Sequence, residues 1–298
     1  MTNATYARRV TRHAYAKINL YLDILSRRAD GFHDLLTVMH SLSLHDDVSV
    51  EIFPCGEKQI SLRVYGARLP VDQKNLAYRA AEAFLAAIGQ NARVHVNIRK
   101  KLPIAAGLAG GSSDAAATLR AIAELFGNPL SEDNMLALGA ALGSDVPYCM
   151  VGGTQICRGR GELMQPLALS EPLYAVVATA HGERVSTPRA FAETDTYYNN
   201  FDGSVPHGAD FDRLCRALAD GTLGENADCL YNAFEPVVLP TCTGAADLRE
   251  RMLALGAYAA HMSGSGPSVF GLFKTHDQTL DAARALGPFA YVATSAKL

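Results

Sequence analysis

The sequence lacks long apolar runs, paired cysteines and an excess of one charge. Its longest apolar segments, 136–142 and 173–180, are far shorter than the roughly 20 residues that cross a bilayer, so we expect no membrane span. The six cysteines form no CxxC pair and follow no signal peptide, which favours reduced thiols in a cytoplasmic protein over disulfides or a metal site. A net charge of -3 gives no overall attraction to nucleic acid or an anionic membrane.

The chain also lacks internal repeats and low-complexity segments, and its composition is that of a globular protein. Its 298 residues favour two domains of roughly 150 residues each. The hydrophobic pattern stops and restarts between Gly161 and Pro172, so we expect an N-terminal domain over 1–165 and a C-terminal domain over 166–298.

Apolar periodicity predicts strands and helices in both halves, without strict alternation, which indicates an α+β fold. In the first half we expect strands near 18–24, 48–52, 60–64 and 94–98, and helices near 75–88, 113–126 and 132–142. In the second half we expect strands near 173–179, 258–262, 268–273 and 291, and helices near 211–219, 245–255 and up to 286.

A segment rich in small residues, Leu102 to Asp114, lies between a predicted strand and a predicted helix. It has neither the GK[ST] ending of a Walker A loop nor the GxGxxG spacing of a dinucleotide site. Small residues let the backbone approach an anion, and a helix starting near Ser113 would direct its free N–H groups at that anion. The alternative is an ordinary strand-to-helix turn in which Ser112 caps the helix.

The pattern PxxxGLxGGSS in this segment resembles the phosphate loop of the superfamily named for galactokinase, homoserine kinase, mevalonate kinase and phosphomevalonate kinase (GHMP kinases). The resemblance implies that the loop surrounds the ATP triphosphate. Alanines stand at 105, 106 and 109, where many members carry glycine, so we expect a stiffer loop. The implied ATP-binding residues are Pro103, Ile104, Ala105, Ala106, Gly107, Leu108, Ala109, Gly110, Gly111, Ser112 and Ser113.

Four further segments, 14–20, 28–33, 142–147 and 263–268, resemble one branch of that superfamily, the 4-diphosphocytidyl-2-C-methyl-D-erythritol kinases. The resemblance implies the two-domain GHMP kinase fold, with a ribosomal-protein-S5-like N-terminal domain and a ferredoxin-like α/β plait C-terminal domain. It also implies an ATP-dependent kinase that phosphorylates the 2-hydroxyl of 4-diphosphocytidyl-2-C-methylerythritol, in the non-mevalonate route to isoprenoid precursors.

Two residues are candidates for the chemistry of phosphoryl transfer, which needs a proton acceptor beside the attacking hydroxyl and positive charge near the γ-phosphate. Asp145, in a loop after a predicted helix, is the candidate acceptor. Lys17, in a predicted strand, is the candidate cation. The resemblance assigns the same two positions as the catalytic pair. Taken singly, Asp145 also fits a turn residue and Lys17 a solvent-facing strand position.

Binding of a cytidine base needs an aromatic face and a few polar partners. Phe32 and His33 fit this need, and Asn19 lies on the strand face of Lys17, where it can orient substrate hydroxyls. Further substrate residues are implied by the resemblance alone: Thr187, Phe191, Gly264, Ser265 and Gly266.

For the adenine, the resemblance points to Asn75, Leu76 and Lys100, although Asn75 equally fits a helix cap. No HxxxH or HxH spacing indicates a metal site, so we expect only Mg²⁺ that arrives with ATP, with Ser113 as a candidate ligand. The substrate is then a small molecule, with no nucleic-acid or membrane partner, and the protein a monomer or weak homodimer. Two alternatives stay open: another GHMP kinase acting on mevalonate, homoserine or a sugar, and a non-catalytic ATP-binding or RNA-binding protein of the same fold.

Overall fold

The computed structural model describes residues 8–198 and 208–296, and the chain divides into two compact units. Unit 1 comprises residues 1–16, 45–104 and 109–151, and unit 2 comprises residues 17–44, 105–108 and 152–298. The units are not contiguous in sequence because the two longest strands, β1 (Arg8–Arg27) and β2 (His33–Pro54), each contribute residues to both. The domain boundary near residue 165 stays a prediction.

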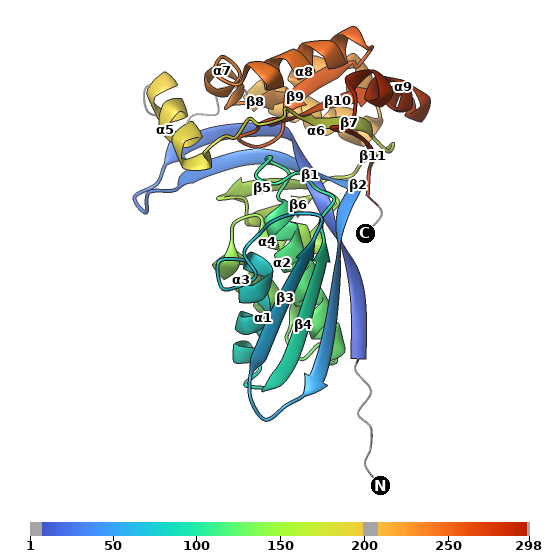
Figure 1. Ribbon diagram of the computed structural model, residues 1–298. Coiled ribbons are helices and arrows are strands. Elements are labelled where there is room, and N and C mark those ends of the chain that lie inside the picture. The colour runs from blue at the N-terminus through green and yellow to red at the C-terminus, as the bar shows by residue number, and fades with distance from the viewer. Residues whose placement is uncertain (1–7, 199–207, 297–298) are drawn as a thin grey trace. The chain divides into compact units, whose positions relative to one another are not determined.

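Unit 1 packs helices against strands (Figure 1). Besides parts of β1 and β2, its elements are β3 (Gln59–Tyr65), α1 (Leu76–Ala87), β4 (Ala92–Arg99), α2 (Gly110–Leu125), α3 (Glu132–Leu142) and α4 (Val146–Val151). Strand β4 pairs antiparallel with β2, with Val50 opposite Val96, and parallel with β3. The inward side chains of these strands form one core with α1 and α2, whose apolar residues recur at helical spacing.

Unit 2 contains a four-stranded antiparallel sheet in the order β11-β7-β10-β9. The strands of this sheet are β7 (Tyr174–Thr179), β9 (Ala259–Met262), β10 (Ser268–Phe273) and β11 (Ala290–Thr294). Unit 2 also contains β5 (Thr154–Gly159), β6 (Leu163–Pro166) and β8 (Tyr231–Asn232), which belong to the other sheet. Its α-helices are α5 (Thr187–Tyr197), α6 (Gly208–Asp220), α7 (Glu235–Val238), α8 (Thr243–Ala254) and α9 (His276–Leu286). Strand β10 is buried along its whole length, and Val269 and Phe273 join the core of this unit.

The predicted elements are present, and the mixed α+β fold class is confirmed. The sequence pattern did not indicate β5, β6, β8, α4, α5 or α7. It also began the second helix near Ser113, whereas α2 begins at Gly110. Among the described residues, no helix combines the length and the apolar character of a membrane span.

Candidate active site

Lys17 is a buried strand residue of unit 2, with 5% of its surface exposed. Its Nζ donates to Asn19 Oδ1 at 2.7 Å, because residues two apart in a strand share a face. The same oxygen accepts the backbone N–H of Gly264 at 3.0 Å, and Asn19 Nδ2 donates to Thr37 Oγ1 at 2.8 Å. Within the described residues no carboxylate pairs with Lys17, so its charge is available to an anion.

The turn at 263–268 meets the centre of the glycine-rich loop inside unit 2. Ser263 Oγ donates to the Gly107 carbonyl at 3.0 Å. A buried side chain, Asn232, holds the turn by donating to the carbonyls of Met262 at 2.7 Å and Gly264 at 2.9 Å. Gly264 has a φ of +56°, and a Cβ there would lie 3.3 Å from Lys17 Nζ. The turn therefore presents its backbone, rather than side chains, to the lysine.

His33 and Phe191, both predicted to bind the cytidine base, are stacked in unit 2 with ring centroids 4.5 Å apart and planes at 12°. Asp195, on the same helix α5 as Phe191, accepts a hydrogen bond from His33 Nε2 at 2.7 Å. Because an ionised carboxylate only accepts, this contact places the proton of the ring on Nε2 and leaves Nδ1 of the neutral ring as an acceptor.

The other predicted substrate residues occupy two further places in unit 2. The hydroxyls of Thr187 and Ser265 lie 2.9 Å apart, so the start of α5 contacts the 263–268 turn. Phe32 does not join the His33–Phe191 stack. Its ring is 49% exposed, and the guanidinium of Arg160 lies 4.4 Å from its centroid.

The glycine-rich loop enters α2 through a residue that is not glycine. Ala109, the N-cap of α2, has a φ of 57°, and Ala105 has a φ of 52°. These left-handed conformations favour glycine, so two of the alanine positions noted in the sequence carry local strain. Ser112 lies in the first turn, so the alternative that it caps the helix is wrong. The Ser113 hydroxyl is buried and donates to the Gly110 carbonyl at 3.0 Å.

Asn75 and Leu76, at the start of α1, lie in unit 1 near the start of α2 and the end of α3. The Asn75 side chain caps α1 by accepting the Ala77 N–H at 3.0 Å. A Cβ built on Gly111, at the start of α2, would lie 3.9 Å from Leu76 Cδ1, and one on Gly143, at the end of α3, would lie 4.0 Å from it. Leu76 is therefore adjacent to the glycine-rich helix start and to the segment before Asp145.

Asp145 occupies the short turn between α3 and α4 in unit 1, and its backbone carbonyl accepts the Cys149 N–H at 3.0 Å. Its side chain is half-buried. In the part of the chain that the structure describes, the Asp145 carboxylate accepts no hydrogen bond, so it is available to a substrate hydroxyl. Lys17 belongs to unit 2, so the catalytic pair stays a prediction.

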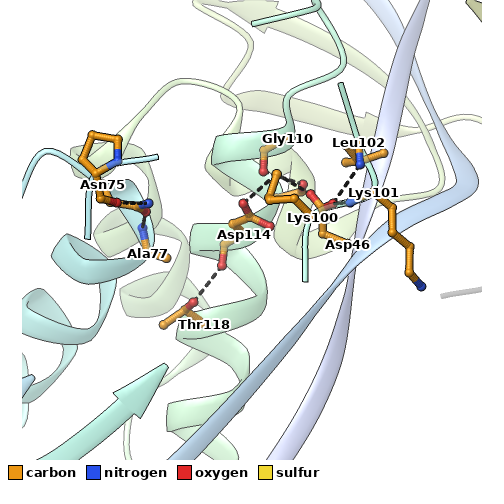
Figure 2. A network of polar contacts seen from close by, with 11 residues as sticks. Asp46, Asn75, Ala77, Lys100, Lys101, Leu102, Gly110, Asp114 and Thr118 are labelled. Carbon is orange, nitrogen blue, oxygen red and sulfur yellow. Dashed lines mark hydrogen bonds and ion pairs between the residues drawn. The ribbon is translucent and has the colours of Figure 1, made fainter. Parts of the chain in front are cut away.

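Lys100 is held between two buried carboxylates of unit 1 (Figure 2). Its Nζ bonds Asp46 Oδ2 and, at 2.9 Å, Asp114 Oδ2. Burial lowers the pKa of Lys100, but the two carboxylates raise it above its ordinary value. Burial, followed by repulsion from Asp46, outweighs the attraction of Lys100 and raises the pKa of Asp114 from 3.8 to about 7.

The raised pKa of Asp114 predicts a loss of stability with increasing pH. Because the folded pKa lies above the unfolded one, the contribution is complete below about pH 4 and declines as pH rises through about 7. The variant Asp114→Asn does not titrate, so between pH 5 and 8 it should gain roughly 2–3 kcal/mol in unfolding free energy relative to the unchanged protein. Urea unfolding at both pH values measures this, and parallel pH curves would contradict it.

The histidines of unit 1 include one pair that spacing along the chain did not indicate. Ligand atoms of His13, His45 and Asp47 lie within 4.8 Å of one another because β1 and β2 place them together. Lys101 Nζ, however, lies 2.9 Å from Asp47 Oδ2, so this carboxylate already has a cation partner. We assign no metal to this cluster.

Four polar residues of the site were not singled out from the sequence: Asp46, Asp114, Asp195 and Asn232. Among these four, Asp114 alone had a local signal, since it closes the glycine-rich segment and is followed by a run of alanines in α2. The other three contact residues at least 30 positions away, so no local pattern indicates their partners.

The chain matches the family models of the GHMP kinases N-terminal domain over residues 75–153 and of the GHMP kinases C-terminal domain over residues 214–293. It is 41% identical to the 4-diphosphocytidyl-2-C-methyl-D-erythritol kinase of Pelotomaculum thermopropionicum, with 88% of each chain covered. It is 38% identical to the same enzyme of Caldicellulosiruptor saccharolyticus, over 93% of this chain and 92% of that one.

Solved structures agree with these relatives. A crystal structure of 4-(cytidine 5'-diphospho)-2C-methyl-D-erythritol kinase superposes with a TM-score of 0.78 at 34% identity, covering 97% of this chain and all of the other. Homoserine kinase from Cytophaga hutchinsonii shares the fold, with a TM-score of 0.74 at 20% identity over 99% and 96% of the two chains. The two-domain fold and the full-length similarity together show that this chain belongs to the ATP-dependent GHMP kinases, in the branch of the 4-diphosphocytidyl-2-C-methyl-D-erythritol kinases.

Proposed function

We propose that this protein transfers the γ-phosphate of ATP to the 2-hydroxyl of 4-diphosphocytidyl-2-C-methyl-D-erythritol, a step toward isoprenoid precursors. The observation that carries the proposal is the buried Lys17, whose ammonium bonds Asn19 beside the backbone of Gly264. A buried cation without a carboxylate partner in the described chain is suited to the negative charge of a transferring phosphoryl group. Relatives that match over about nine tenths of their length are named for this substrate.

In the proposed mechanism the residues of this chain position the reactants and move one proton. Asp145 accepts the proton of the 2-hydroxyl, and the oxygen attacks the γ-phosphorus as its bond to the β-phosphate oxygen breaks, which releases ADP. Lys17 stabilises the charge of the transferred group, and Asn19 orients the substrate hydroxyls. The glycine-rich loop, from Pro103 to Ser113, binds the triphosphate through backbone N–H groups at the start of α2.

The donors of unit 1 fit Mg²⁺ that arrives with ATP, because this ion prefers oxygen ligands and keeps most of them from phosphate and water. Ser112, in the first turn of α2, is partly exposed and offers a hydroxyl oxygen. Ser113 fits less well because its buried hydroxyl already donates to Gly110. When bound, the ion offsets charge on the phosphate oxygens. The cytoplasmic location expected from six cysteines without a CxxC pair, and a monomer or weak homodimer, remain parts of the proposal.

The stack of His33 and Phe191 is the proposed base site. With its proton on Nε2, His33 offers Nδ1 as an acceptor to the exocyclic amine of cytosine, whereas uracil has an acceptor at that position. Phe32 adds an exposed aromatic face, and Arg160 beside it carries positive charge suited to the diphosphate.

Replacing Phe191 by alanine should raise the KM for the cytidyl substrate at least about 5-fold and leave the KM for ATP unchanged. Stacking of a base on an aromatic ring contributes roughly 1–3 kcal/mol to binding, and the lower value corresponds to about a 5-fold change in KM. Steady-state kinetics with each substrate varied in turn measures both constants. Phe289→Ala is a matched control, since Phe289 is half exposed and stacks on His181 in the same unit. An equal rise of both KM values would place Phe191 outside the base site.

The reaction itself is tested by the phosphorus NMR spectrum of the product. Transfer to the 2-hydroxyl adds one phosphomonoester signal and leaves both diphosphate signals in place. Loss of the diphosphate signals, or a product phosphorylated on another hydroxyl, would contradict the proposed reaction.

A further inference from the structure

Three buried charges join the two ends of the glycine-rich loop in unit 1. Lys100 and Lys101 follow β4 at the entry to the loop, and Asp114, the fifth residue of α2, lies just after its exit. Asp46 of β2 lies behind the entry, where its Oδ1 accepts the backbone N–H groups of Lys101 at 2.5 Å and Leu102 at 2.9 Å. Figure 2 shows Lys100 between Asp46 and Asp114.

The loop passes close to the lysine at its exit as well. A Cβ built on Gly110, the first residue of α2, would lie 3.3 Å from Lys100 Nζ. The ammonium is therefore bonded by Asp46 at the loop entry and by Asp114 in the helix, and it lies close to Gly110 at the loop exit. A displacement of either end of the loop would break at least one of these contacts.

Such an arrangement is costly for the fold, which argues for a role beyond stability. The side chains of Lys100, Asp46 and Asp114 are 4%, 0% and 4% exposed. Buried ion pairs often stabilise a protein no more than apolar residues of similar volume. The second carboxylate adds an uncompensated charge, and Asp114 Oδ1 has no hydrogen-bond partner among the described residues.

We propose that Asp46, Lys100 and Asp114 are positioning residues that hold the entry and the exit of the glycine-rich loop in the geometry that binds the nucleotide phosphates. This inference rests on the proposed function in one respect, that ATP binds at this loop. Lys100 then acts on the loop through the carboxylates of Asp46 and Asp114. Because its ammonium is bonded to both, it is not free to bond adenine directly.

The decisive comparison sets Asp114→Ala, which removes the contact with Lys100, against Asp114→Asn, which keeps the shape and an oxygen for Lys100. Asp114→Ala should raise the KM for ATP several-fold and leave the KM for the cytidyl substrate unchanged, whereas Asp114→Asn should keep most of the affinity for ATP. Asp133→Ala is a matched control because Asp133 is an exposed aspartate in the first turn of α3 in the same unit. Equal KM values for ATP in Asp114→Ala and Asp133→Ala would overturn the proposal.

A second variant, Lys100→Met, removes the bridging charge at nearly constant length. It should raise the KM for ATP about 10-fold or more and leave the KM for the cytidyl substrate unchanged, and an unchanged KM for ATP would overturn the proposal. If this variant does not fold, the comparison of Asp114→Ala with Asp114→Asn decides alone. Equilibrium binding of a fluorescent ATP analogue, displaced by ATP, separates the proposed nucleotide site from the proposed positioning role. No binding by the unchanged protein refutes the nucleotide site, whereas equal binding by the protein and its variants refutes only the positioning role.

Discussion

Replacing Asp145 by asparagine is expected to lower kcat by 10²- to 10⁴-fold, the range attributed to a positioned general base. The amide of asparagine cannot accept the proton of the substrate hydroxyl, although it has nearly the same volume. Asp145 lies in the turn between α3 and α4, outside the glycine-rich loop, so the affinity for ATP should stay nearly unchanged. Single-turnover ADP formation and titration with a fluorescent ATP analogue measure the two effects separately.

The exposed Asp133 again serves as the control for removing one carboxylate from unit 1, and Asp133→Asn should keep its full kcat. A variant Asp145→Asn that retains most of its kcat would remove Asp145 from the role of base. A variant that loses ATP binding as well would show that Asp145 acts on the nucleotide rather than on the hydroxyl.

The second large effect is expected from Gly107→Ala, at the centre of the glycine-rich loop. Gly107 has a φ of +75°, and a Cβ there would overlap the carbonyl oxygen of Ser263 and lie 3.3 Å from the Gly266 backbone nitrogen. Backbone strain and overlap together should lower the unfolding free energy by roughly 3 kcal/mol or more. The displaced loop should also raise the KM for ATP.

Gly182→Ala separates these two causes because Gly182 has nearly the same φ, +79°, with nothing within 4 Å of a new Cβ. It should lose only about 1 kcal/mol, the strain of a left-handed alanine. Thermal and urea unfolding of both variants measures the difference. Equal losses would show that the contact of Gly107 with Ser263 is not tight in solution.

Strand β4 of unit 1 could be predicted from sequence because only one of its faces is fully buried. Val94, Val96 and Ile98 lie in the core, and the residues between them are more exposed, which gives the alternation directly. Strand β5 was missed because its first four residues are all buried, which leaves no alternation. Helix α4 was missed because it has six residues and contains Pro147 in its first turn, which favoured a loop.

The chemistry of the site could be predicted only in part. Asn19 was expected on the face of Lys17, and their hydrogen bond confirms this. Burial of Lys17 was not predicted, because the sequence around a strand lysine is the same whether its side chain faces solvent or is covered by a distant turn. Here the covering turn is 263–268, which is far from Lys17 in the sequence. Likewise, nothing near Asp46 along the chain indicates that its partner is Lys100, 54 residues later. Local sequence therefore indicated which residues share a strand face, but it did not indicate the distant residues that contact them.

The proposed reaction is best tested by ADP release from the purified protein with Mg²⁺ and ATP. Diphosphocytidyl-methylerythritol, mevalonate and homoserine are offered in parallel, and ADP is detected by a coupled assay. We expect ADP release that depends on diphosphocytidyl-methylerythritol and that Lys17→Met and Asp145→Asn strongly reduce. ADP release that depends on mevalonate or homoserine, but not on diphosphocytidyl-methylerythritol, would contradict the proposed reaction.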